Sequence, residues 1–284
     1  MNKFIGLVNA WNSLHFIEPV MKMAIEYCDE VMVAVGPHSY SMEKYEDGTT
    51  EIAERYRDND KVTFVPVQFG GSHVKSKTPT LNLMLEKSKL FDVGNWVWLL
   101  DTDEFHFRDD VKRMKDGVAK TDCNAICITD EKCFFINMKY YLTNPDRRKI
   151  WKITDKSNKF LPLQKWTGPV DNVYYHEACV HHYTLLLDPH SKKEFWSTEY
   201  EGSGQDVKVR WIDEIYLPFE LDNQEKWIEK NEKMFGRKTP FMQSDYGTDI
   251  NGRLFEYDGK YPEHIQETEL HKIEDFRKLY NDEI

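Results

Sequence analysis

A short apolar strand that ends at two carboxylates constrains this chain more than any other feature. The run Trp96–Leu100 is apolar throughout, and Asp101 and Asp103 follow it. Such runs are typical of strands buried on both faces of a parallel sheet. If the strand continues to Asp103, both carboxylates point the same way. Ligands bind at the carboxyl ends of these strands, so the pair predicts a divalent-cation site beside phosphate oxygens, with an acidic turn as the alternative.

Predicted strands and helices alternate over the first hundred residues. Ser13 and Thr78 are expected to cap two of the helices. Pro79 suits the first turn of the second helix, whereas Pro19 should disturb the first turns of the other. In chain order, periodicity predicts elements at 3–8, 13–28, 30–35, 49–57, 61–67, 78–90 and 96–105. This alternation predicts an α/β fold with a mostly parallel sheet flanked by helices.

Beyond Phe107 the pattern changes, and the best internal boundary lies between this residue and Asp110. The last forty residues or so are acidic and rich in tyrosine, and we expect them to be peripheral. The elements predicted in this part are a short helix, an extended stretch, a strand and a charged helix, at 110–119, 123–142, 176–187 and 225–235.

Charge is distributed unevenly along the chain. The formal net charge of −11 argues against a uniformly basic nucleic-acid-binding protein. Residues 132–166 nevertheless hold nine basic and two acidic side chains, with aromatic residues between them. This segment is either a solvated basic face or a surface for a partner that carries phosphate.

Cysteine usage and hydropathy bear on the compartment. Five cysteines are an odd number, and they lack paired zinc-ligand spacing. Reduced thiols in a cytoplasmic protein are expected, with a zinc site as the alternative. The N-terminus enters a strand at once and shows no secretion signal. Since no apolar run approaches the roughly 20 residues of a membrane span, we expect a soluble protein.

Four short segments resemble the motifs of one enzyme family, in the same order. They are a loop after the first strand, an Asp-Gly-Thr turn that opens a helix, an Asp-x-Asp motif with a following acidic residue, and a late His-Tyr element: Val8–Asn12, Asp47–Ile52, Asp101–Glu104 and Val180–Tyr183. Together they make the chain similar to family 2-like glycosyltransferases of the GT-A fold. The resemblance covers about two-thirds of the chain.

The resemblance implies a Rossmann-like GT-A domain with a C-terminal, acceptor-side elaboration. Residues 1–107 would bind the nucleotide sugar, residues 108–210 would bind the acceptor, and residues 211–284 would form a helical or irregular extension. The implied enzyme is a hexosyl- or pentosyltransferase that uses a nucleotide sugar, foremost a UDP-sugar, and an acceptor hydroxyl. One departure is Gly36–Ser39, after the second strand, where such enzymes often carry an acidic residue.

A metal is implied as well, because a Lewis acid stabilises the departing diphosphate. Asp103 is the first ligand expected, and Asp101 would hold the same ion or the donor. His182 would add an imidazole nitrogen, which suits Mn²⁺ better than Mg²⁺, although a structural histidine is the alternative. His181 and His182 should face opposite sides of a strand, so only one of them can be a ligand.

Further residues are expected to contact the donor. Trp11 would stack on the base or lie in the core, and Lys75 and Lys77 would reach the diphosphate or be solvated. The full set of expected donor contacts is Asn9, Trp11, Asp47, Lys75, Lys77 and Asp101.

The acceptor half holds two further sets of candidates. An inverting reaction needs a general base, for which the candidates are Asp130, Glu131, Asp171 and Glu177. The residues expected to contact the acceptor are Arg147, Arg148, Lys149 and Trp151. That acceptor is a glycan or a hydroxymethylated base in DNA, where aromatic rings would stack and basic groups would neutralise phosphates.

Three other functions share parts of this pattern. A haloacid-dehalogenase phosphatase also has Asp-x-Asp after an apolar strand, but near the chain start and with Thr or Val where this chain has Phe105. A nucleotidyltransferase shares the metal and the nucleotide. A non-catalytic protein that binds a nucleotide sugar or nucleic acid is disfavoured by the presence of both Asp101 and Asp103.

Overall fold

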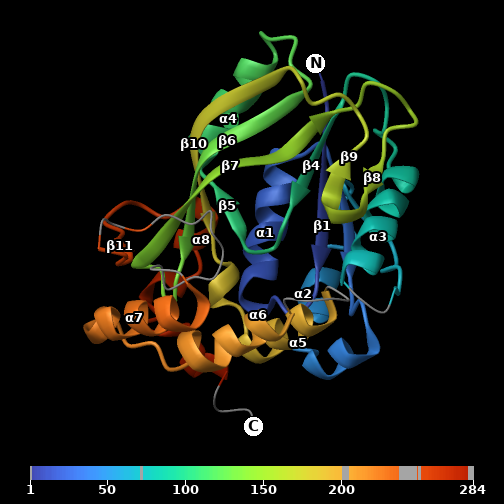
Figure 1. Ribbon diagram of the computed structural model, residues 1–284. Helices are drawn as coiled ribbons and strands as arrows, with labels where there is room; N and C mark the ends of the chain where they lie inside the picture. Colours follow the sequence, from blue (N-terminus) through green and yellow to red (C-terminus); the bar gives the residue numbers. More distant parts are fainter. Residues whose placement is uncertain (1, 71–72, 200–204, 237–247, 249–250, 281–284) are drawn as a thin grey trace.

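A mixed β-sheet runs through the molecule (Figure 1). The computed structural model describes residues 2–70, 73–199, 205–236, 248 and 251–280. Within them, the sheet has nine strands in the order β3-β2-β1-β4-β7-β6-β10-β5, and β11 pairs with β7. The strand bounds are β1 (Phe4–Ala10), β2 (Glu30–Val35), β3 (Val62–Phe64), β4 (Trp96–Leu100), β5 (Glu104–His106), β6 (Ala125–Phe134), β7 (Tyr140–Lys152), β10 (Val173–His182) and β11 (Phe255–Glu256).

The direction of the strands confirms the expected fold class. Strands β3, β2, β1 and β4 are parallel, and among the described strands of this sheet only β5 and β7 run against the others. The sheet is therefore mostly parallel. Strands β2 and β3 lie on one side of β1 and β4 lies on the other, so the strand order reverses between β1 and β4. In open α/β sheets, the crevice outside the carboxyl ends at such a reversal is the usual ligand site.

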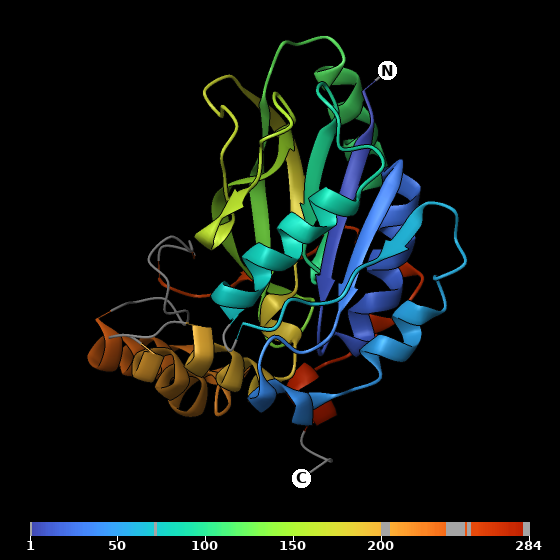
Figure 2. The ribbon, with the colours of Figure 1, turned by 90° about the vertical axis from the view of Figure 1, so that its right-hand side faces the viewer.

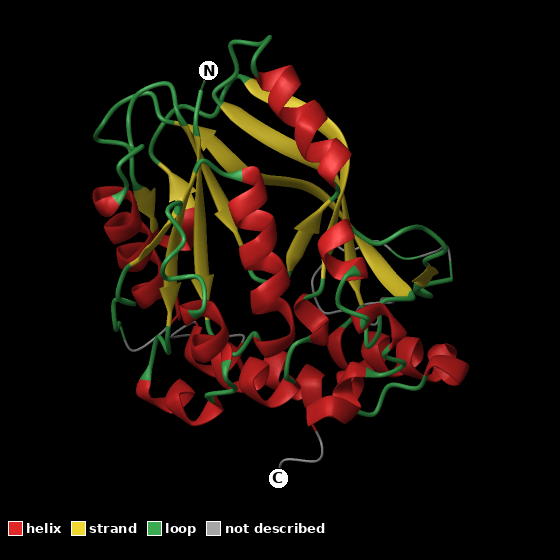
Figure 3. Ribbon diagram, turned by 180° about the vertical axis from the view of Figure 1, so that it is seen from behind, coloured by secondary structure: helices red, strands yellow, loops and turns green. Residues whose placement is uncertain are grey.

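Helices cover both faces of the sheet. Their bounds are α1 (Leu14–Tyr27), α2 (Thr49–Glu54), α3 (His73–Lys87), α4 (Arg108–Val118), α5 (Pro189–Glu199), α6 (Gln205–Trp211), α7 (Gln224–Phe235) and α8 (Glu263–Gln266). Helix α3 lies on one face, together with the hairpin of β8 (Phe160–Leu161) and β9 (Lys165–Trp166) (Figure 2). Helices α1 and α4 lie on the other face (Figure 3).

Strand β4 shows why its sequence is apolar at every position. Trp96, Trp98 and Leu100 pack into the cluster that contains α1 and α4. Val97 and Leu99 point the other way, into the cluster that contains α3. All five side chains are at most 1% exposed. A strand sandwiched between two layers of helix has no solvent face and needs no polar alternation.

Several predicted element bounds shift in the structure. Helix α1 begins at Leu14 and contains Pro19 without interruption. Helix α3 begins at His73, so Thr78 and Pro79 lie inside it rather than at its start, and the Thr78 hydroxyl donates to the carbonyl of Leu161. The predicted extended stretch 123–142 is a hairpin of β6 and β7.

Within residues 251–280 the C-terminal segment packs against the core, so for this described part the expectation that it is peripheral was wrong. Phe276 is fully buried and stacks on Phe16 of α1, with ring centroids 6.2 Å apart. Ile265 is also fully buried in the cluster that contains α1. This segment therefore completes the outer layer of that face. Sequence periodicity gave no sign of it, because the buried side chains are spread over short irregular turns.

Two sequence expectations concern thiols and membranes. All five cysteines carry free thiols, and only Cys179 among them is partly exposed. Among the described residues, no helix combines the length and the apolar character that crossing a bilayer requires.

Candidate metal and nucleotide site

The acidic motif is a tight turn between two strands. Strand β4 ends at Leu100, the amide of Glu104 donates to the carbonyl of Asp101 over 3.2 Å, and β5 begins at Glu104. The extended alternation expected through Asp103 is thus interrupted. The amide of Tyr183 donates to the carbonyl of Asp103 over 2.7 Å, which holds the turn against the end of β10.

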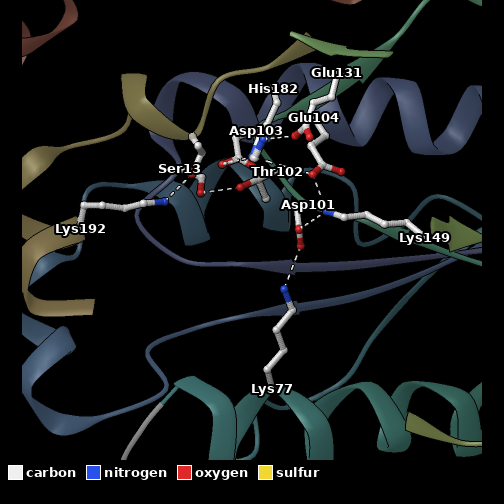
Figure 4. A network of polar contacts seen from close by, with 11 residues as sticks. Ser13, Lys77, Asp101, Thr102, Asp103, Glu104, Glu131, Lys149, His182 and Lys192 are labelled. Atoms are coloured by element: carbon white, nitrogen blue, oxygen red, sulfur yellow. Dashed lines mark hydrogen bonds and ion pairs between the residues drawn. The ribbon is translucent and has the colours of Figure 1, made fainter. Parts of the chain in front are cut away.

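Asp101 is bound by two lysines. Nζ of Lys77, from α3, lies 2.9 Å from its Oδ1, and Nζ of Lys149, from β7, lies 2.5 Å from its Oδ2 (Figure 4). Burial by itself would raise the pKa of Asp101, but the two ammonium groups hold that pKa well below its usual range. Asp101 is therefore an ionised carboxylate whose two oxygens each face an ammonium group.

Asp103 faces an imidazole instead. Nε2 of His182 lies 3.5 Å from its Oδ2, while Nδ1 of the same ring contacts Glu131. Burial alone would lower the pKa of His182, but the charges of Asp103 and Glu131 outweigh burial and raise that pKa to about 9. Burial would likewise raise the pKa of Asp103, yet the charge of His182 holds it far below its usual value.

Glu104 joins the two sides of the turn. Its carboxylate contacts Nζ of Lys149 and lies 3.8 Å from Nε2 of His182. Glu104, Glu131 and His182 are all buried, and one ligand atom of each lies within 4.8 Å of the others. They form a buried cluster of carboxylates and imidazole in which a metal ion can be held.

The donor set fits a divalent cation. Four carboxylates meet here, whereas two lysines and the protonated imidazole of His182 contact them, so the cluster keeps an excess of negative charge. Carboxylate oxygens combined with one imidazole nitrogen suit Mn²⁺ better than a purely oxygen-binding ion. The contact with Glu131 fixes Nδ1 of His182, and this leaves Nε2 directed at Asp103 and Glu104. The four carboxylates are those of Asp101, Asp103, Glu104 and Glu131.

The loop after β1 borders this cluster at the strand reversal. The hydroxyl groups of Ser13 and Thr102 lie 2.8 Å apart and join the ends of β1 and β4. Ser13 was expected to cap α1, but its hydroxyl makes no capping bond. Asp47 makes the capping bond instead. Its Oδ2 accepts from the amide of Leu14 over 2.9 Å, and its Oδ1 accepts from the amide of Thr49 over 3.0 Å. A distant carboxylate therefore satisfies the start of α1.

The other expected donor contacts lie around the same sheet edge. Trp11 is half-buried and donates through Nε1 to the carbonyl of Met42 over 3.0 Å. Asn9 lies half-buried at the end of β1, and Lys75 is exposed on α3. Of the two lysines, Lys77 reaches the acidic turn, through Asp101.

The four general-base candidates are dispersed. Asp171 accepts from Asn124 at the start of β6, the opposite end of the sheet from the acidic turn. Asp130 pairs with Lys132, and since neighbours on a strand point to opposite faces, it lies on the other face of β6 from Glu131. Glu131 contacts His182, and Glu177 is exposed on β10.

The four residues expected to contact the acceptor do not form one surface in the structure. The backbones of Arg147 and Arg148 belong to β7, but their side chains lie outside the described residues. Lys149 is directed at Asp101 and Glu104. Trp151 is only 5% exposed and packs on Trp166, so its ring belongs to the core rather than to an acceptor surface.

Sequence reasoning missed three parts of this site. Glu104 was read only as the acidic residue after the motif, and Glu131 only as a possible base. Lys192 of α5 donates to the hydroxyl of Thr184 over 2.6 Å, and its charge helps to lower the pKa of Asp103. Nothing in the sequence marked it, since it lies in a short polar run. The alternation of side chains along β10 was a usable signal, because it assigns His182 to one face of the sheet, and Glu131 of β6 contacts it there.

Comparison with known proteins found similarity among solved structures. No protein-family model and no curated protein matches this sequence. Among solved structures, the crystal structure of S. aureus TarS 1–349 is similar over 82% of this chain and 80% of that chain, at 14% sequence identity and a TM-score of 0.41. At this level the likeness assigns no function, so function has to be inferred from the site of this chain.

Proposed function

We propose that this protein is a metal-dependent glycosyltransferase, which moves a sugar from a nucleotide sugar to an acceptor hydroxyl. The observation that carries the proposal is the position of the acidic turn. It follows β4 beside β1, where the strand order reverses and α/β sheets bind nucleotides. There, Nε2 of His182 faces the carboxylates of Asp103 and Glu104.

The metal would be held by His182 and Asp103, with Glu104 beside them. A bound divalent cation supplies Lewis-acid stabilisation of the charge on the departing diphosphate. Glu131 keeps the imidazole in the orientation that presents Nε2. The amide of Tyr183 fixes the backbone of Asp103, so both ligands are pre-positioned by β10.

The lysine side of the turn has a separate task. Asp101 holds Lys77 and Lys149 beside the metal ligands. Their ammonium groups place positive charge next to the position where the diphosphate would lie, and this adds to the attraction for the leaving group. Asp101 thus positions cations in addition to any contact with the donor.

The donor that we propose is a UDP-sugar, and the metal is Mn²⁺. The acceptor is a glycan or a hydroxymethylated DNA base. If the reaction inverts configuration, none of the four general-base candidates is singled out, since Glu177 is exposed in the middle of β10 rather than at its end beside the turn. Asp171 and Asp130 are directed away from the site, and Glu131 is engaged by His182.

A thermal-shift screen tests the proposal. UDP-, GDP- and dTDP-sugars are added with and without Mn²⁺, since a ligand that binds the folded state raises its melting temperature. We expect one nucleotide class to stabilise the protein only with Mn²⁺, and Asp103→Ala to abolish the effect. Stabilisation that ignores both the metal and the substitution would overturn the proposal. Release of pyrophosphate during turnover would instead identify a nucleotidyltransferase.

A further inference from the structure

Helix α5 brings a third lysine to the acidic turn. Figure 4 shows Lys192 reaching toward Ser13 and Asp103 from one side of the turn, while Lys149 approaches from the other. Nζ of Lys192 donates to the Thr184 hydroxyl, a neutral acceptor, over 2.6 Å.

Hydrogen bonds hold the start of helix α5 beside the loop after β1, where the strand order reverses. The carboxylate of Asp188 accepts from the amides of His190 and Ser191, which caps the helix. The hydroxyl of Ser191 donates to Oδ1 of Asn12, in the loop after β1, over 3.1 Å. Because Lys192 follows Ser191 directly, its backbone is held beside the loop that borders the expected nucleotide site.

The start of α1 offers little to a phosphate in this protein. In many α/β folds, a helix N-terminus beside the first strand attracts the phosphate with its free amides. Here the carboxylate of Asp47 already accepts from the amide of Leu14, and the Thr49 hydroxyl accepts from the amide of Ser13. A carboxylate at this position also repels an anion. Positive charge for the phosphates must therefore come from a metal and from side chains.

We propose that Lys192 of α5 binds the phosphates of the nucleotide donor, on the side of the acidic turn opposite Lys149. This inference rests on the proposed function and extends it to a residue outside the Asp-x-Asp and His-Tyr motifs. The Thr184 hydroxyl positions the ammonium group until a phosphate is bound. Lys192 and a phosphate oxygen then form a charge-assisted hydrogen bond, and no covalent change occurs.

Calorimetric binding of nucleoside diphosphates tests this. UDP, GDP and dTDP are titrated with Mn²⁺ into the wild type, Lys192→Met and Lys192→Arg. For the nucleotide that binds the wild type, we expect Lys192→Met to weaken binding by about tenfold or more and Lys192→Arg to retain most of the affinity. The matching nucleoside, which lacks phosphates, should bind the wild type and Lys192→Met equally.

The neighbouring lysine provides a matched control. Nζ of Lys193 pairs with Asp213 over 2.6 Å at the surface, so Lys193→Met removes the same charge from the same helix. It should change nucleotide affinity by less than about twofold. Thr184→Val keeps Lys192 but removes its positioning hydroxyl, and it should weaken binding by a few fold. This variant reads out the same interaction if Lys192→Met does not fold.

The outcomes separate the two proposals. A wild type that binds no nucleoside diphosphate with Mn²⁺ overturns the proposed function and this inference with it. A wild type that binds one, while Lys192→Met and Thr184→Val bind it equally well, overturns the role of Lys192 alone. An equal loss in Lys192→Met and Lys193→Met would also overturn it, because the effect would then be one of overall charge.

Discussion

Two ends of one short turn have opposite surroundings. Asp101 is enclosed by the ammonium groups of Lys77 and Lys149. Asp103, two residues later, faces an imidazole that also contacts Glu131. One end is a closed set of ion pairs, whereas the other is rich in carboxylates around one nitrogen. Identical residues in a motif therefore have different roles, which their neighbours from other elements decide.

Two buried histidines near the turn have pKa values that are shifted in opposite directions. Burial, followed by the charge of Lys77, lowers the pKa of His38 to about 4 on the lysine side. On the carboxylate side, Asp103 and Glu131 overcome burial and raise the pKa of His182 to about 9. Burial is the larger cause of the shift at His38 and the charge of Lys77 adds to it, whereas at His182 the two carboxylates act against burial and outweigh it.

The largest effect is expected on stability at the lysine end. Asp101→Asn removes the shared partner of two largely buried ammonium groups, which should lower the free energy of unfolding by about 3 kcal/mol. Urea denaturation at neutral pH measures the change. Asp130→Asn, which breaks the more exposed pair with Lys132, should cost less than about 1 kcal/mol. Equal losses in the two variants would show that the lysine end is not a buried ion-pair set.

Metal affinity should distinguish the two aspartates. Asp103→Asn removes a proposed ligand and should weaken Mn²⁺ binding by more than about 100-fold, whereas Asp101→Asn should weaken it by less than about tenfold. Titration calorimetry with Mn²⁺ alone measures both. If Asp101→Asn loses as much affinity as Asp103→Asn, the two carboxylates share one ion and the contrast drawn here is wrong.

A smaller effect is expected from the group behind the imidazole. Glu131→Gln keeps the shape of the side chain but weakens the hold on Nδ1 of His182, so Mn²⁺ affinity should fall about 10- to 100-fold. Asp130→Asn, the adjacent residue on the opposite face of β6, should leave the affinity unchanged. An unaltered affinity in Glu131→Gln would mean that His182 is oriented by other contacts.

The smallest effect is expected on the stability of the protein at acidic pH. The pKa of His38 is about 4 when folded and about 6.5 when unfolded, so below pH 6.5 the unfolded chain binds a proton that the folded protein does not. Stability should therefore fall as pH drops from about 6.5 to 4, by on the order of 1–3 kcal/mol. His38→Gln should reduce this slope in urea denaturation series. Parallel curves for both proteins would refute the assignment.

The sequence predicted the first half of the fold well because its signals there are local. Strand β2 spans Glu30–Val35 both in the sequence prediction and in the structure, and β4 begins at Trp96 as expected. Apolar runs between breaking residues determine such elements. The start of α1 shows the limit. Ser13 was a good capping residue by type, but Asp47, over thirty residues away, makes the bond.

The site was predicted in part, for the same reason. The Asp-x-Asp position and His182 meet in space, as the resemblance implied. The partners that assign their roles come from elements whose relative placement only the folded chain sets. Lys149 lies on β7 and Glu131 on β6, and each was assigned a different role because its neighbours were unknown. Trp151 was misplaced for a related reason, since a tryptophan between basic residues resembles a surface residue.

The pairing of β5 with β10 has a consequence for how the protein matures during translation. Glu104 lies opposite His182 in this antiparallel ladder, although 77 intervening residues separate them in the chain. The acidic turn thus emerges from the ribosome long before its imidazole. Contacts of such sequence separation form slowly. A nascent chain that stops before β10 can build the first four strands but no complete cation site, so ligand-dependent protection from proteolysis would begin only once β10 has been synthesised.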